Sequence, residues 1–414
     1  MNKIYRKCKK SPNNPIQKET FLYIISRAFE RASYYGIRGI LLFYMINVIN
    51  LSHQGANHIY SFFAAGFVFS QFFGALLGDL VIGNKKTMLI GGILQALGAF
   101  AFCIPSVNGL YFGMGLILSG SGLYDPNIMS QFGKLYLNKP LIMDSGFSLF
   151  YFAVSIGALA GTFIITYNLD NFNYTIGFIT GGIFMLFSLA VSLFIKEKEV
   201  IAPVDYTVDF DKRLLAILLV GVYWCVYDYS SNGFAYFNYE YSGNSVISIQ
   251  NFFPALGSAF VLPIGITASI VWTYFYNSPL TKITIGFISG ALALLLLLFL
   301  PQDLDNGFAL IFGVSMFLLS LAEIRLGPIL YSILTKNSNP KYLAIIISLS
   351  FIPSQLFMYV MGFHFVNPSS EIFSIIIGAF ILSIIAIGLV ILLIVKNKKT
   401  DNFPMMSKPQ SIDI

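Results

Sequence analysis

Apolar stretches long enough to cross a lipid bilayer recur along nearly the whole 414-residue chain. A membrane-spanning helix needs about 20 apolar residues, and twelve such stretches lie between polar or Gly/Pro-rich breaks. Only 11% of the residues are charged, whereas soluble domains average about 25%. The sequence therefore predicts an all-α polytopic membrane protein, with helices near 21–49, 58–82, 86–105, 109–136, 142–167, 174–195, 213–236, 250–276, 281–300, 307–335, 341–363 and 371–395.

The only long polar joint within this array is 196–212, which divides the predicted helices into six plus six. We expect an N-terminal half at 1–195, a cytoplasmic linker at 196–212, a C-terminal half at 213–396 and a cytoplasmic tail at 397–414. Two six-helix halves around a central cavity are the usual layout of the major facilitator fold. The span count thus predicts that fold.

The distribution of basic residues predicts the orientation. With the N-terminus placed in the cytoplasm, 21 of the 25 Lys and Arg residues fall in cytoplasmic segments and none falls in an outer loop. This is the positive-inside pattern of membrane proteins. We expect both termini in the cytoplasm, residues 237–249 outside, and insertion in the plasma membrane. The other four basic residues, Arg27, Arg31, Arg38 and Arg325, lie within predicted helices.

The first predicted helix carries a polar stripe. Arg27, Glu30, Arg31, Tyr34 and Arg38 are spaced so that they share one helical face. Ionisable residues at membrane depth are costly and usually functional. We expect this stripe to face a cavity, the alternative being that Glu30 and one arginine pair only to pack helices together.

Three further acids lie within predicted spans. Asp125 precedes Pro126 in a glycine-rich helix, Asp228 lies among aromatic residues, and Glu323 is two positions from Arg325. Because residues two apart on a helix face different ways, Glu323 and Arg325 should face different neighbours. Asp125 is either a gating or ligand residue or the counter-ion of a helix 1 arginine. Burial favours the protonated form of an acid, so Asp228 and Glu323 are candidate proton carriers or, alternatively, ionised salt-bridge partners.

Six segments carry a resemblance to a known family. They are RAFERASYYGIR (27–38), GALLGDLVIGNKK (74–86), GSGLYDPNI (120–128), DSGFSLFYFAVSIGA (144–158), YWCVYDY (223–229) and AEIRLGPILYS (322–332). Together they make the chain similar to the proton-dependent oligopeptide transporter family of the major facilitator superfamily, as a divergent member. The resemblance implies a proton-coupled symporter.

The departures from that family involve charge. Arg27 stands where the family has glutamate and Asp125 where it has lysine, and these two family residues are thought to pair. We therefore predict an Arg27–Asp125 ion pair with the charges exchanged. Ser155 replaces a family asparagine and Asp228 a longer glutamate.

The resemblance also implies roles for individual residues. Arg31 and Arg38 would bind a carboxylate, and Glu323 and Asp228 an amine. The predicted binding set is Arg31, Tyr34, Tyr35, Arg38, Asp125, Ser155, Trp224, Asp228 and Glu323, and the predicted proton-coupling set is Arg27, Glu30, Asp125, Asp228 and Glu323. The predicted gating loop, Gly78, Asp79, Gly83, Lys85 and Lys86, would clamp helix ends in one state.

The functional prediction is import of a small zwitterion with protons, a di- or tripeptide being the first candidate. The alternative is a carrier of an amino-acid derivative, a nucleoside-like solute or a carboxylate siderophore. The chain has no HExxH, nucleophile-elbow or P-loop motif, so we expect no enzyme. Substrate, protons and lipid are the expected partners of a monomer, with no cofactor, metal or nucleic acid.

Overall fold

The computed structural model of the protein describes residues 16–171, 173–197, 210–242, 246–275, 277–300, 306–362 and 371–401. The described chain is all helical, as predicted, and contains twelve long helices. The first six are α2 (Glu19–Asn47), α3 (His53–Leu76), α4 (Asn84–Ala101), α5 (Val107–Tyr136), α6 (Met143–Asn171) and α7 (Tyr174–Leu193). The second six are α8 (Phe210–Ser242), α9 (Val246–Tyr274), α10 (Pro279–Leu297), α11 (Asn306–Asn337), α12 (Leu343–Gly362) and α13 (Glu371–Asp401).

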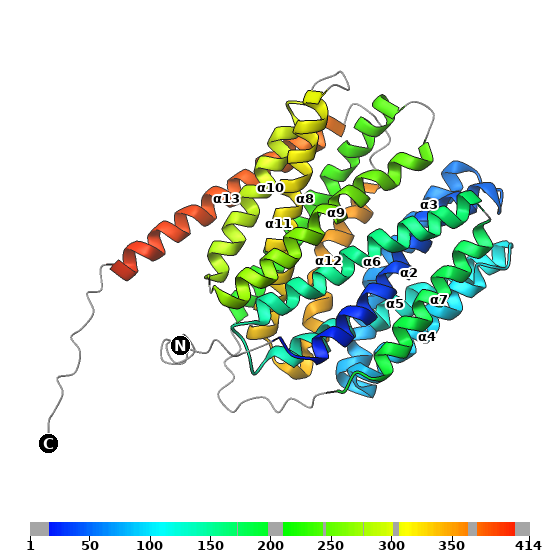
Figure 1. The fold of residues 1–414 in the computed structure, drawn as a ribbon, viewed down its shortest axis with the longest axis horizontal. Helices are drawn as coiled ribbons and strands as arrows, with labels where there is room; N and C mark the ends of the chain where they lie inside the picture. The colour runs from blue at the N-terminus through cyan, green and yellow to red at the C-terminus, as the bar shows by residue number, and fades with distance from the viewer. Residues whose placement is uncertain are drawn as a thin grey trace.

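The two sets of six helices lie side by side as separate bundles (Figure 1). The bundles meet where α6 packs against α9 and α11, and where α12 packs against α3 and α5. The predicted six-plus-six arrangement of the fold is therefore confirmed. The proposed division at 196–212 falls largely on residues outside the described ranges.

Six of the twelve described helices are long and apolar enough to cross a bilayer by length and composition alone, among them α6, α7, α10 and α13. The charged stripe on α2 explains why that helix fails such a test although it belongs to the bundle. The predicted helix ends agree with the structure within about six residues. The ends move because side chains cap the helices beyond the apolar stretch: Ser52, for example, accepts a hydrogen bond from Gly55 N and starts α3 early.

The connection between α3 and α4 is tight and unusual. The end of α3 continues as a π-helical segment, η2 (Leu77–Ile82), and the chain then turns at Gly83 with φ of 87°. Only glycine adopts that backbone conformation without strain. This turn fixes the position of the predicted gating loop.

Candidate functional site

A cavity of about 270 Å³ lies between the two bundles. Its walls come from α2, α3, α5 and α6 on one side and from α8, α11 and α12 on the other. Eleven of its 21 lining residues are aromatic, so its walls combine aromatic surface with charged and polar groups. The aromatic residues are Tyr34, Tyr35, Tyr60, Phe63, Phe67, Phe147, Phe150, Tyr151, Trp224, Tyr331 and Phe351.

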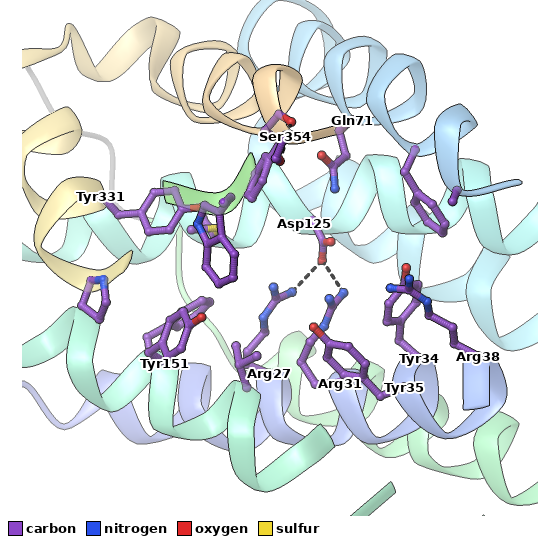
Figure 2. A pocket seen from close by; sticks show the side chains of 18 of the residues that line it. Arg27, Arg31, Tyr34, Tyr35, Arg38, Gln71, Asp125, Tyr151, Tyr331 and Ser354 are labelled. Atoms are coloured by element: carbon purple, nitrogen blue, oxygen red, sulfur yellow. Dashed lines mark hydrogen bonds and ion pairs between the residues drawn. The ribbon is translucent and has the colours of Figure 1, made fainter. Parts of the chain in front are cut away.

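A ring of four charged residues lies in one wall of the cavity. Arg27 Nη1 lies 2.6 Å from Asp125 Oδ1, and Arg31 Nη2 lies 2.7 Å from the same oxygen. Figure 2 shows both guanidinium groups converging on Asp125. The predicted Arg27–Asp125 pair is therefore confirmed, with the addition that Asp125 is shared by two arginines.

Glu30 closes the ring from behind. Its carboxylate accepts from Arg27 Nη1 at 2.9 Å and from both Nε and Nη2 of Arg31, at 2.7 and 2.5 Å. Glu30 is completely buried, and it is not among the residues that line the cavity. Two cations thus face two anions in a closed and balanced cluster, which we call the charged ring (Arg27, Glu30, Arg31 and Asp125).

Arg38 lies on the same helix as the ring but has different surroundings. Its Nε donates a hydrogen bond of 2.7 Å to the Tyr60 hydroxyl, and its guanidinium lies over the Tyr60 ring at 5.9 Å. Arg31 instead lies over Tyr34, at 4.6 Å from the ring centroid. Because a hydroxyl does not neutralise a guanidinium, Arg38 presents a positive charge to the exposed part of the cavity.

Glu323 faces the cavity indirectly. Its Oε1 accepts a hydrogen bond of 2.5 Å from the hydroxyl of Tyr151, which lines the cavity from α6. Gly327 makes room for that ring, since a Cβ atom there would lie 3.1 Å from it. The bond joins α6 of one bundle to α11 of the other. Tyr151 was not singled out from the sequence, although it lies within the 144–158 motif.

Arg325 confirms the expectation that it and Glu323 face different neighbours. A Cβ atom at Gly286 of α10 would lie 3.2 Å from Arg325 Cβ, so Arg325 lies against α10 whereas Glu323 faces α6. Two other predicted residues differ in their position. Trp224 lines the cavity, but Ser155 is buried outside the lining and its hydroxyl donates to the Tyr151 carbonyl oxygen at 3.4 Å.

Asp228 lies on α8, and its side chain is outside the described part of the structure. Its predicted contribution to the amine site and to proton coupling stays a prediction.

The gating loop makes contacts both within and between the bundles. Asp79 Oδ1 accepts from Asn84 Nδ2, and its Oδ2 accepts from the backbone N–H of Ile345 in the first turn of α12, both at 2.9 Å. Lys85 Nζ donates to the Leu193 carbonyl oxygen at 3.3 Å. At Gly78 any Cβ atom would overlap the Asn127 side chain. Lys86 is exposed.

A second ionic cluster lies where the helix ends of the two bundles meet, and the sequence did not predict it. Asp144 Oδ2 lies 2.6 Å from Lys282 Nζ, and Asp144 Oδ1 lies 2.8 Å from Lys336 Nζ and 2.5 Å from Ser332 Oγ. Lys282 is one of the 21 basic residues that the sequence assigned to cytoplasmic segments, but it is only 2% exposed. No spacing rule connects residues 138 positions apart. We call Asp144, Lys282, Ser332 and Lys336 the inter-bundle cluster.

Neutral hydrogen bonds continue this contact. Ser145 of α6 lies 2.8 Å from the Ser269 hydroxyl and 2.7 Å from the Thr273 hydroxyl, both on α9. Together with the Asp79–Ile345 bond, they join the bundles at the end of the molecule where the gating loop lies.

Comparison with known proteins places this fold in a family. The sequence profile of the Major Facilitator Superfamily matches residues 23–362. The chain therefore belongs to the major facilitator superfamily, whose members are integral membrane transporters and not enzymes.

Within this superfamily the chain is similar to peptide transporters. It is 31% identical over 176 residues to dipeptide and tripeptide permease B of Yersinia enterocolitica, which is 42% of this chain and 36% of that protein. It is 32% identical over 169 residues to the di-/tripeptide transporter of Lactococcus lactis, 39% of this chain and 34% of that one. The matched segments thus span about a third of the length of these curated relatives. These matches confirm the resemblance seen in the motifs.

Solved structures show the same fold over nearly the whole chain. A peptide transporter POT in complex with sulfate matches with a TM-score of 0.68 at 20% identity, over 95% of this chain and 97% of the other. A POT family transporter in complex with a thioalcohol-conjugated peptide matches with a TM-score of 0.70 at 20% identity, over 92% and 96%. At this identity the likeness concerns the fold.

Proposed function

We propose that this protein is a proton-coupled symporter that imports di- or tripeptides by alternating access, acting as a monomer in the plasma membrane with both termini in the cytoplasm. The observation that carries the proposal is the cavity itself. It is lined by Arg38, whose guanidinium has no carboxylate partner among the described residues, and by Tyr151, behind which lies the half-buried acid Glu323. A zwitterion has a carboxylate that can pair with Arg38 and an ammonium group that can pair with Glu323.

The proposed binding mode follows from these charges. The substrate carboxylate binds Arg38, with Arg31 beside it, and the substrate ammonium approaches Tyr151 and Glu323. The aromatic walls accept apolar side chains of varied shape, as a carrier of many peptides requires. The names of the relatives, dipeptide and tripeptide permease and di-/tripeptide transporter, support the same substrate class.

Proton coupling is assigned to Glu323 rather than to the charged ring. Asp125 and Glu30 are each already paired with the guanidinium groups of Arg27 and Arg31. Glu323 has no ion pair within the described part of the chain, and its carboxylate accepts the Tyr151 hydroxyl across the two bundles. Protonation of Glu323 weakens its hold on Tyr151, which joins the bundles, and so helps the cavity to change the side on which it opens.

A non-peptide zwitterion is the second candidate. The observation in its favour is the exchanged Arg27–Asp125 pair, which places an acid where the peptide-transporting family has lysine. An amino-acid derivative, a nucleoside-like solute or a carboxylate siderophore would then occupy the same cavity.

Uptake by purified protein in liposomes separates these candidates. With an acidic exterior, labelled alanyl-alanine should accumulate inside, and a protonophore should abolish the accumulation. Unlabelled di- and tripeptides should compete, whereas alanine, a nucleoside and a carboxylate siderophore should not. Accumulation that follows a sodium gradient and ignores pH, or competition by a non-peptide solute alone, would contradict the proposal.

A further inference from the structure

Gln71 is a polar residue of the cavity that no motif singled out. It lies on α3 and lines the cavity. Figure 2 shows its side chain directed into the cavity on the side of Asp125, with Ser354 of α12 beside it. Its Oε1 atom is buried and has no hydrogen-bond partner among the described residues. It is therefore an acceptor that lacks a donor, in the wall of a binding cavity.

Polar residues that share this cavity wall direct their hydrogen bonds to other acceptors in the described structure. The guanidinium groups of Arg27 and Arg31 are directed at Asp125 and Glu30. The Ser354 hydroxyl donates to the Phe351 carbonyl oxygen of its own helix at 3.2 Å. A buried acceptor without a partner is unfavourable, and a ligand that brings an N–H group to this wall removes that cost.

We propose that the carboxamide of Gln71 binds the peptide bond of the substrate, an inference that rests on the proposed function. A carboxamide has an acceptor oxygen and a donor NH₂ group, which complement the N–H and C=O of a peptide bond. Arg38 and Glu323 recognise the charged ends, which every amino acid also has. Gln71 recognises the group that only a peptide has between them, so it separates peptides from single amino acids.

The test compares an amide with its ester. Alanyl-lactate differs from alanyl-alanine in having oxygen in place of the peptide N–H. Both are used as competitors of labelled alanyl-alanine uptake in liposomes, with wild-type protein and with Gln71→Leu. A site that donates or accepts a neutral hydrogen bond discriminates by about five- to tenfold. We expect the wild-type protein to bind alanyl-lactate more weakly than alanyl-alanine by about that factor. Gln71→Leu should bind the two compounds equally.

Two further variants make the comparison specific. Gln71→Met has an unbranched side chain of similar length and should behave as Gln71→Leu does, which covers the case in which the leucine variant fails to fold. Gln95→Leu is the matched control, because Gln95 is a buried glutamine of α4 whose Nε2 also has no hydrogen-bond partner among the described residues, but which does not line the cavity. It should keep the wild-type ratio of ester to amide.

The outcomes are distinct. An ester-to-amide ratio that stays at the wild-type value in both Gln71 variants, a wild-type ratio of one, or loss of the ratio in Gln95→Leu overturns the inference and leaves the proposed function standing. Failure of wild type to take up any peptide overturns the proposed function and this inference with it. A ratio that collapses only in the Gln71 variants supports both.

Discussion

The two ionic clusters are both buried but connect different parts of the molecule. The charged ring joins α2 to α5 within the first bundle, and it balances two arginines against two acids. The inter-bundle cluster joins α6 to α10 and α11, and it sets one acid against two lysines. Lys336 remains 18% exposed, whereas Glu30 in the ring is fully enclosed.

This difference indicates what each cluster would do in the alternating access proposed above. In alternating access the bundles move as near-rigid bodies against one another, so contacts within a bundle persist and contacts between bundles must break. A balanced and largely buried ring suits a permanent part of the cavity wall. A cluster with an excess cation at the edge of the interface suits a contact that opens in each cycle.

The largest expected effect is on the charged ring. Asp125→Ala should abolish transport and lower stability by about 3–5 kcal/mol, because it leaves two buried arginines with only one acid, Glu30. Arg27→Ala should cost less, since Arg31 still pairs with Asp125. Thermal unfolding of the purified variants and liposome uptake measure both effects.

Reversal of the charges provides the control for the ring. Arg27→Glu combined with Asp125→Lys should recover part of the activity that either single change removes, because the pair is restored with the family's signs. Losses that simply add in this double-mutant cycle would show that the two residues act independently.

A smaller effect is expected at the inter-bundle cluster. Asp144→Asn leaves Lys282 and Lys336 repelling each other, and should shift the equilibrium towards opening at that end by about 2–3 kcal/mol. A cysteine in place of Thr335, which is buried against Gly133 of the first bundle, then becomes reactive to a thiol reagent. Lys336→Met, which leaves one lysine for one acid, should change the reaction rate less. Equal reactivity in wild type and Asp144→Asn would contradict this role.

The Tyr151–Glu323 bond should affect coupling more than binding. Tyr151→Phe keeps the ring beside Gly327 and removes the hydroxyl, and Glu323→Gln removes the proton site. Both should reduce pH-driven accumulation about tenfold or more, consistent with a hydrogen bond to a charged group worth about 1.5–3 kcal/mol. Exchange of peptide across the membrane without a gradient should persist. Tyr167→Phe, an exposed position on the same helix, is the control, and a full loss of exchange in Tyr151→Phe would point to a binding role instead.

The smallest effect is expected from neutral contacts between the bundles. Ser145→Ala removes hydrogen bonds to Ser269 and Thr273 and should shift the same opening equilibrium by only about 1 kcal/mol. Thiol reactivity of the Thr335 cysteine again measures it. A shift as large as that of Asp144→Asn would mean that charge is not what distinguishes the inter-bundle cluster.

The sequence predicted what depends on local pattern. The lengths of the apolar stretches predicted twelve helices, and the polar joint at 196–212 predicted two sets of six. The resemblance to a family with the opposite signs at Arg27 and Asp125 predicted their pair. The inter-bundle cluster was not predicted, because Asp144 and Lys282 come together only in the folded protein, where α6 meets α10. The sequence around either residue does not indicate the other. Gln71 was not predicted as a cavity residue for a related reason. An isolated glutamine in an apolar helix shows no periodicity. That its side-chain oxygen lacks a hydrogen-bond partner among the described residues can be seen only in the folded structure.

Distances between spin labels test the central claim that the ring is permanent and the inter-bundle cluster opens. In a background without native cysteines, labels at exposed Asn138 and Lys341 report on the two bundles, and labels at Asn138 and Lys86 report within the first bundle. With dipeptide at acidic pH, the first distance should lengthen and the second should stay constant. A constant distance between the bundles, or a change within the first bundle as large as that between them, would contradict the account.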